Sequence, residues 1–123
     1  MSLELADVTV TYPDGGTRVT ALDGVSLRAA AGTVTAVVGP SGSGKSTLLA
    51  AAATLVPPDA GRVVVDGRDV AGLSASGRAR LRRERVGLVF QQPNLLPALT
   101  VADQLAVPAH LNGRSPRTVR HRV

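Results

Sequence analysis

The chain has 123 residues, 44% of them hydrophobic and 19% charged, and a formal net charge of +5. These proportions exclude a disordered protein, and the length suffices for one domain with a core of its own. The absence of cysteine excludes a disulfide scaffold, and no apolar run approaches the ~18 residues that span a membrane, so we expect a cytosolic protein.

Strands are predicted for the first part of the chain. Leu3–Val10 alternates apolar and polar residues, and Val19–Leu27 does so less cleanly. Between them, Pro-Asp-Gly-Gly at 13–16 supplies a fixed φ and positions that accept positive φ, which predicts a turn. A second turn at Ala31–Gly32 leads into the apolar run Thr33–Val38, which predicts another strand.

The next stretch, Gly39–Thr47, fits the phosphate-binding pattern G-x-x-x-x-G-K-[ST] at every fixed position. Its glycines let the backbone turn N–H groups inward around a phosphate chain. Lys45 can reach the outer phosphates, and the hydroxyl of Ser46 is placed to bind the Mg²⁺ of a nucleotide. A Gly/Ser-rich linker would explain neither the Lys-Ser-Thr ending nor the apolar flanks. We expect the whole loop to bind nucleotide: Gly39, Pro40, Ser41, Gly42, Ser43, Gly44, Lys45, Ser46 and Thr47.

A helix and a strand are predicted after the loop. Ser46–Leu55 is rich in Ala and Leu without a breaker, which predicts the helix. Arg62–Asp66 predicts a short strand, and Asp66-Gly67 is a strong turn signal. The strand resembles the apolar strand ending in Asp that holds the magnesium water in nucleotide hydrolases. However, Gly67 stands where a catalytic Glu would be expected, so we interpret Asp66 as a turn residue.

The second half of the chain is basic. Residues 67–123 hold ten basic and three acidic residues, against four and six before them. Ser74–Glu84 predicts a helix with Leu81 inward and its arginines in water. A nucleic-acid or lipid-headgroup patch is one interpretation of these arginines, but no aromatic residues lie among them for base stacking, which favours a solvated helix face and no nucleic-acid partner. The arginines concerned are Arg78, Arg80, Arg82, Arg83 and Arg85.

Toward the end, Val86–Phe90 is another apolar run that predicts a strand, and Gln91-Gln92-Pro93 follows it. Thr100–Asp103 has the form of a capping box and predicts a helix through about Leu111, bent or interrupted near Pro108. The polar and basic stretch 112–123 is expected to be frayed.

Tyr12 and Phe90 are the only aromatic residues. From the residues alone, Tyr12 is either an ordinary strand residue or a ring on which an adenine could stack. Taken together, Tyr12, the strand Val19–Leu27, the phosphate loop and Val86–Gln92 resemble the ATP-binding subunit of an ABC transporter over residues 3 to about 113.

The resemblance implies roles for two residues outside the loop. Tyr12 would stack on adenine, and Gln91 would touch Mg²⁺ and the attacking water and contact the membrane-spanning subunits. The sequence of residues 90–97, Phe-Gln-Gln-Pro-Asn-Leu-Leu-Pro, is also similar to the corresponding segment of transporters of the lipoprotein-releasing and macrolide-export type.

The fold that the resemblance implies is α/β. It would comprise an N-terminal antiparallel β layer (1–32), an incomplete P-loop NTPase core (33–93) and the start of a helical subdomain (94–123). We expect ATP and Mg²⁺ as ligands, membrane-spanning subunits and a second ATP-binding subunit as partners, and a place at the cytoplasmic face of the membrane.

Other family motifs are absent from this sequence. It holds no Leu-Ser-Gly-Gly-Gln-like signature and no apolar run followed by Asp-Glu, and neither His110 nor His121 has the context of the switch histidine. We therefore expect a truncated subunit that binds ATP without hydrolysing it alone. The alternatives are a non-enzymatic nucleotide-binding fragment or degenerate relic and, more distantly, a small P-loop kinase, which the long β segment before the loop and Gln91 disfavour.

Overall fold

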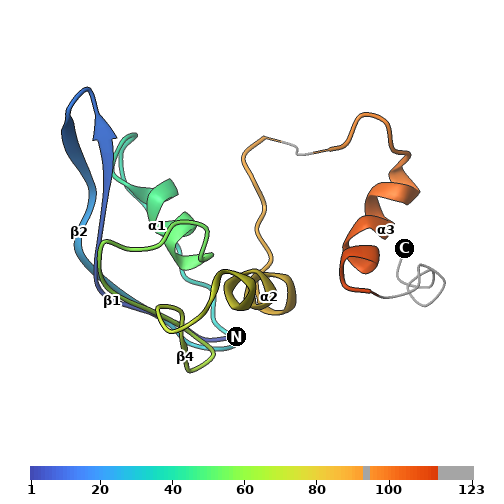
Figure 1. Ribbon diagram of the computed structural model, residues 1–123, viewed down its shortest axis with the longest axis horizontal. Coiled ribbons are helices and arrows are strands. Elements are labelled where there is room, and N and C mark those ends of the chain that lie inside the picture. Colours follow the sequence, from blue (N-terminus) through green and yellow to red (C-terminus); the bar gives the residue numbers. More distant parts are fainter. Residues whose placement is uncertain (93–94, 114–123) are drawn as a thin grey trace. The chain divides into compact units, whose positions relative to one another are not determined.

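The computed structural model describes residues 1–92 and 95–113 and divides into two compact units, Met1–Val86 and Gly87–Val123 (Figure 1). The first unit holds the four strands of the sheet together with helices α1 (Lys45–Ala52) and α2 (Ala75–Arg85). The second holds helix α3 (Val101–Leu111). None of the helices in these described ranges is both long and apolar enough to cross a membrane.

An antiparallel sheet forms the frame of the first unit, in the order β2-β1-β3-β4. The two N-terminal strands are confirmed and are longer than predicted: β1 is Leu3–Asp14 and β2 is Thr17–Ala29. The hairpin turn lies at Gly15 and Gly16, which have φ of 50° and 92°. In this region of φ a side chain would be strained, so the two glycines let the strands extend to the tip.

The other two strands of the sheet are β3 (Ala60–Val65) and β4 (Arg68–Asp69), with a turn between them. Asp66 lies in this turn with φ 49°. Its Oδ1 accepts a hydrogen bond from the Ser2 backbone N–H at 2.8 Å. The interpretation of Asp66 as a turn residue is therefore confirmed.

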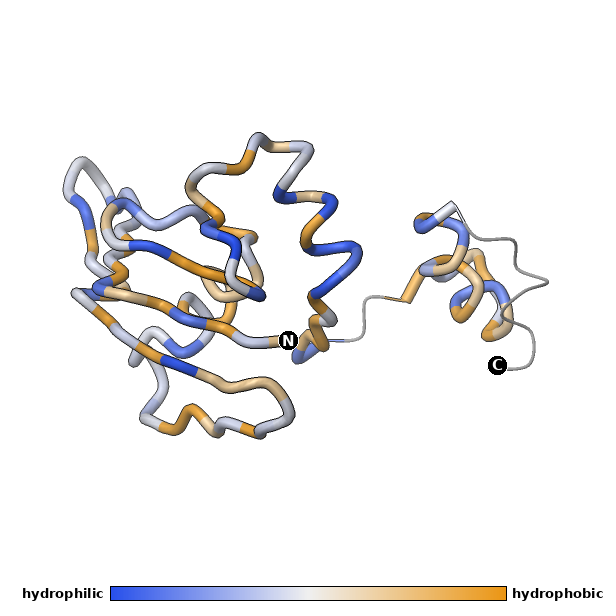
Figure 2. Tube along the Cα trace, turned by 90° about the horizontal axis from the view of Figure 1, so that it is seen from below, coloured by the Kyte–Doolittle hydropathy of each residue, from blue (hydrophilic) through white to orange (hydrophobic). Residues whose placement is uncertain are grey.

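The core lies between the sheet and the two helices of this unit. Figure 2 shows hydrophobic and hydrophilic residues alternating along the strands, as expected for a sheet with one buried face. Leu81 is 4% exposed, which confirms the inward face of α2. The buried cluster consists of Leu5, Val8, Val10, Leu22, Leu48, Ala51, Val63, Val65, Val70 and Leu81.

The helix after the phosphate loop is shorter than the predicted Ser46–Leu55, because α1 ends at Ala52. Thr54 is buried and has φ 59°, which no α-helical residue adopts. From α2, Arg82 donates to the Thr54 carbonyl oxygen at 2.8 Å. Arg82 and Arg78 are half-buried, so the expectation that the arginines of α2 lie in water is wrong for these two.

Two predicted strands are not formed. Thr33–Val38 and Val86–Phe90 carry no strand pairing, and Val34 and Val89 are 99% and 96% exposed. Continuous apolar runs of this kind are typical of parallel strands covered on both faces. A strand needs a neighbour for its backbone hydrogen bonds, and the described residues provide none for either run.

Helix α3 begins as predicted. Thr100 and Asp103 form a complete capping box, in which the Thr100 hydroxyl accepts from the Asp103 N–H at 3.2 Å. Of the predicted bend or interruption near Pro108, the interruption is wrong, because the helix continues to Leu111 and the Asn112 N–H still bonds to the Pro108 carbonyl at 3.2 Å. Pro108 lacks the N–H that would bond to the Gln104 carbonyl, and the helix continues for one turn beyond this missing bond. Residues 114–123, including His121, lie outside the described residues.

Candidate functional site

The glycine-rich loop leads directly into α1, whose start is left uncapped. Gly44 is the N-cap residue, and no side chain bonds to the first turn. In α2 and α3, by contrast, Ser74 and Thr100 accept a hydrogen bond from the third helical N–H. The first N–H groups of a helix have no intrahelical partner. Those of α1 are therefore available to an anion, which the positive end of the helix dipole also favours.

Gly44 lets the loop lie directly against β2. Its φ of 83° is in the left-handed region, and a Cβ built there would collide with the Ala21 carbonyl oxygen and come within 3.2 Å of Leu22 Cδ2. Only glycine fits this position without displacing the loop from the sheet. The fixed Gly of the sequence pattern thus has a packing reason as well as a conformational one.

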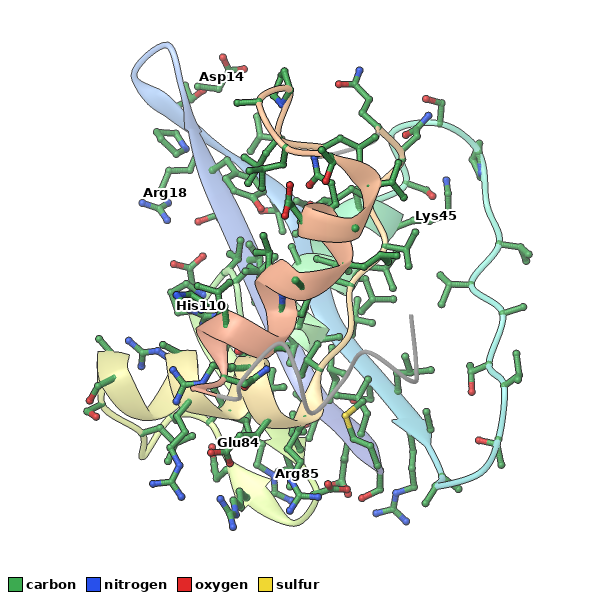
Figure 3. The ribbon with its side chains drawn as sticks, turned by 90° about the vertical axis from the view of Figure 1, so that its right-hand side faces the viewer. Asp14, Arg18, Lys45, Glu84, Arg85 and His110 are labelled. Atoms are coloured by element: carbon green, nitrogen blue, oxygen red, sulfur yellow. The ribbon has the colours of Figure 1, made fainter. Side chains whose placement is uncertain are left out.

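The Lys45 side chain folds back over the loop (Figure 3). Its Nζ donates to the carbonyl oxygens of Gly39 at 2.9 Å and Pro40 at 2.5 Å, and to Ser43 Oγ at 3.3 Å. No carboxylate of the described residues forms an ion pair with it. The ammonium therefore lies at the loop and donates only to neutral oxygen atoms. An anionic phosphate is a stronger acceptor and can replace them.

The next residues supply hydroxyl groups. Ser46 is exposed and Thr47 is half-buried, and within residues 1–92 and 95–113 neither hydroxyl has a hydrogen-bond partner. The same residues hold no cluster of His and acidic side chains that would bind a metal by itself. A hard oxygen such as Ser46 Oγ fits Mg²⁺, which typically keeps waters and takes substrate phosphates as its other ligands.

Tyr12 lies near the end of β1, opposite Val19 of β2, and is 40% exposed. The register of the hairpin shifts between Val10 and Thr11, and the extra residue, Ala21, lies in β2. Strand β1 therefore keeps its alternation, and Tyr12 shares a face with Val10, two residues before it. Val10 pairs with Leu22 and packs in the same cluster as Leu48 of α1. Tyr12 is therefore on the face of the hairpin toward α1, with part of its ring open to a ligand.

A polar cluster that the sequence did not reveal lies on the hairpin next to Tyr12. Asp59 Oδ2 accepts from the Thr11 N–H at 2.6 Å and from Thr11 Oγ1 at 2.9 Å. Arg18 donates from Nε to Thr11 Oγ1 at 2.7 Å and approaches Asp59 Oδ1 at 3.3 Å. The backbone and hydroxyl hydrogen bonds from Thr11, followed by the charge of Arg18, lower the pKa of Asp59 below its ordinary 3.8, despite the opposing effect of desolvation.

The other predicted site residue, Gln91, belongs to the second unit and is exposed there, as are Phe90 and His110.

Most of the arginines of α2 have partners within the protein. Arg80 pairs with Glu84, Arg85 with Asp66, and Arg78 donates to the Leu73 carbonyl. Arg80 and Arg85 are exposed, as the sequence favoured, whereas Arg78, like Arg82, is half-buried and bonds to a backbone carbonyl.

Comparison with known proteins adds a family match and close relatives. The model of the ABC transporter family matches residues 22–122. The methionine import ATP-binding protein MetN of Caulobacter vibrioides is 50% identical over 116 residues, 94% of this chain and 34% of that protein. The lipoprotein-releasing system ATP-binding protein LolD 1 of Rhodopirellula baltica is 41% identical over 112 residues, 91% of this chain and 49% of that protein. The chain thus spans about a third to a half of the length of these relatives.

A solved structure has the same fold. The ATP-binding cassette MJ0796, in a dimeric post-hydrolysis state bound to ADP and Pi, superimposes with a TM-score of 0.85 at 36% identity. The match covers 92% of this chain and 49% of that one. The α/β fold is therefore that of part of an ATP-binding cassette.

Proposed function

Because the chain belongs to the ABC transporter family, we propose that it binds ATP with Mg²⁺ as part of the energising subunit of a transporter. The observation that carries the proposal is the uncapped start of α1 beside the Lys45 ammonium. Free N–H groups and a lysine at one helix start are suited to the phosphates of a nucleotide. The ADP and Pi bound by MJ0796 support the same ligand class.

Each site residue has a role in this proposal. The backbone of Gly39–Thr47 surrounds the phosphates, Lys45 neutralises the outer ones, and Ser46 holds Mg²⁺ through its hydroxyl. Tyr12 stacks on the adenine, for which its exposed ring is suited. Gln91 would touch Mg²⁺ and the attacking water and take part in the contact with the membrane-spanning subunits.

The partners follow from what the relatives are. We propose that the chain works with membrane-spanning transporter subunits at the cytoplasmic face, and that it pairs with a second ATP-binding subunit, as the dimer of MJ0796 suggests. In this proposal residues 1–32 form the β layer, 33–93 the portion of the nucleotide-binding core, and 94–123 the start of the helical subdomain.

Hydrolysis by this polypeptide alone is not part of the proposal. Phosphoryl transfer to water needs cradled phosphates, a held metal ion and a positioned water. The loop provides the first and part of the second, but the 123 residues hold no apolar run ending in Asp-Glu that would position the water. The proposed activity of the chain is therefore binding.

Titration calorimetry with MgATP tests the role of the loop. Lys45→Ala removes a charged contact to phosphate, a loss of about 1.5–3 kcal/mol, so the affinity should fall about 10- to 100-fold. Arg83→Ala is the matched control, because Arg83 is an exposed cation without a hydrogen bond or ion pair to the described residues. Equal affinity of the wild-type chain and Lys45→Ala for MgATP would overturn the proposal.

A further inference from the structure

The segment that carries Tyr12 extends beyond the part of the sheet that β3 supports. The pairing of β3 with β1 stops at Thr9, opposite Ala60, whereas β1 and β2 stay paired to their tip at Asp14 and Thr17. A two-stranded hairpin without a third strand is marginally stable in water. Tyr12 therefore needs another source of rigidity if its ring is to be held ready for a ligand.

Asp59, the residue before β3, continues the contact with β1. Its backbone N–H donates to the Thr9 carbonyl oxygen at 2.8 Å, and its carboxylate accepts from the Thr11 N–H at 2.6 Å. The carboxylate thus occupies the place that a backbone carbonyl would have in a longer strand. Hydrogen bonds to an ionised acceptor are about twice as strong as neutral ones. The side chain of Asp59 therefore fixes the backbone directly beside Tyr12.

Arg18 extends this contact to the second strand of the hairpin. It stands on β2 opposite Pro13 and reaches both the Thr11 hydroxyl and the Asp59 carboxylate. Figure 3 shows Arg18 and Lys45 on opposite sides of the hairpin. Because Thr11 and Tyr12 are adjacent in a strand, their side chains point to opposite faces. The cluster of Thr11, Arg18 and Asp59 thus supports the hairpin from behind and leaves the ring face of Tyr12 open.

We propose that Asp59 is a positioning residue for the adenine of the bound nucleotide. By tying β1 to the segment before β3, it holds Tyr12 in place and contributes to recognition of the base. It contributes little to recognition of the phosphates, because neither the start of α1 nor Lys45 is among its hydrogen-bond partners in the described part of the chain. This inference rests on the proposed function and assigns base recognition and phosphate recognition to different residues of the same site.

Two ligands separate the two kinds of recognition: MgATP, and magnesium tripolyphosphate, which has the phosphates without the base. Asp59→Ala should lower the affinity for MgATP about 5- to 10-fold, within the range that one base stack contributes, and change that for tripolyphosphate less than about 2-fold. Asp59→Asn keeps a neutral oxygen acceptor for the Thr11 N–H but loses the charge that faces Arg18, so it should recover only part of the loss. Asp14→Ala is the control, because this acidic residue of the same hairpin has no side-chain hydrogen bond to the described residues.

Thr11→Val gives a second route that keeps the β-branched shape of the side chain. It removes the hydroxyl that bonds to both Asp59 and Arg18. The affinity for MgATP should fall less than in Asp59→Ala, and the affinity for tripolyphosphate should again stay nearly unchanged. This variant tests the role of Asp59 if Asp59→Ala does not fold. Equal losses for both ligands, or no loss for MgATP, would overturn the role of Asp59 while leaving the proposed function intact. Failure of the wild-type chain to bind either ligand would overturn both.

Discussion

Gly44 shows how one residue fixes the geometry of the loop. It combines a φ of 83° with a backbone oxygen, that of Ala21, in the path of any Cβ. Gly42 has a similar φ of 79° but open space around it, so it is a matched control. Alanine at either position carries the strain of left-handed backbone, about 1–2 kcal/mol. Only Gly44→Ala should also displace the loop from β2, and urea unfolding should show the larger loss of stability there. Equal losses would contradict the packing argument.

At the same scale, the sequence indicated some candidate site residues and not others. Gly39–Thr47 could be proposed from the sequence because a phosphate cradle is made by consecutive residues with fixed spacing. Asp59 could not, because it acts on Thr11, 48 residues earlier, and stands in a Pro-Pro-Asp segment whose local pattern indicates only the end of a helix. A contact between segments that are distant in the chain leaves no periodicity in either of them.

Among the elements, those defined by local signals were predictable. The alternation of β1, the Asp66-Gly67 turn and the capping box of α3 all formed where the sequence placed them. The runs 33–38 and 86–90 have the composition of strands, but a strand depends on neighbours for its hydrogen bonds. Composition can therefore predict that such a run is able to form a strand. Whether it does form one depends on a neighbouring segment with which it can exchange backbone hydrogen bonds.

Hydrogen exchange tests this description of the elements. In the 123-residue chain the amides of residues 34–38 and 87–90 should exchange close to the rate of an unstructured peptide, because no hydrogen bonds protect them within the described residues. The amides of Leu5 and Val63, in paired and buried strands, should exchange far more slowly. Protection at 34–38 as strong as that at Leu5 would mean that this run does form a strand.

For the molecule as a whole, the match to the ATP-binding cassette covers 92% of this chain and 49% of the solved one. The phosphate loop and Tyr12, the candidate residue for stacking on adenine, belong to the first unit. The exposed Gln91 belongs to the second. Binding needs only contacts to the ligand, whereas hydrolysis also needs a positioned water. We therefore propose that this polypeptide binds nucleotide, and that one ATP engages Tyr12 and the phosphate loop together.

The fluorescence of Tyr12 tests that claim most directly. The chain has one tyrosine and no tryptophan, so its intrinsic fluorescence reports on Tyr12 alone. Titration with MgATP should change this fluorescence saturably, and in Lys45→Ala the midpoint should move about 10- to 100-fold higher, because the base and the phosphates belong to one ligand. Two results would contradict the claim that one ATP engages Tyr12 and the phosphate loop together. One is a tyrosine fluorescence that stays constant while calorimetry shows MgATP binding, and the other is an unchanged titration midpoint in Lys45→Ala.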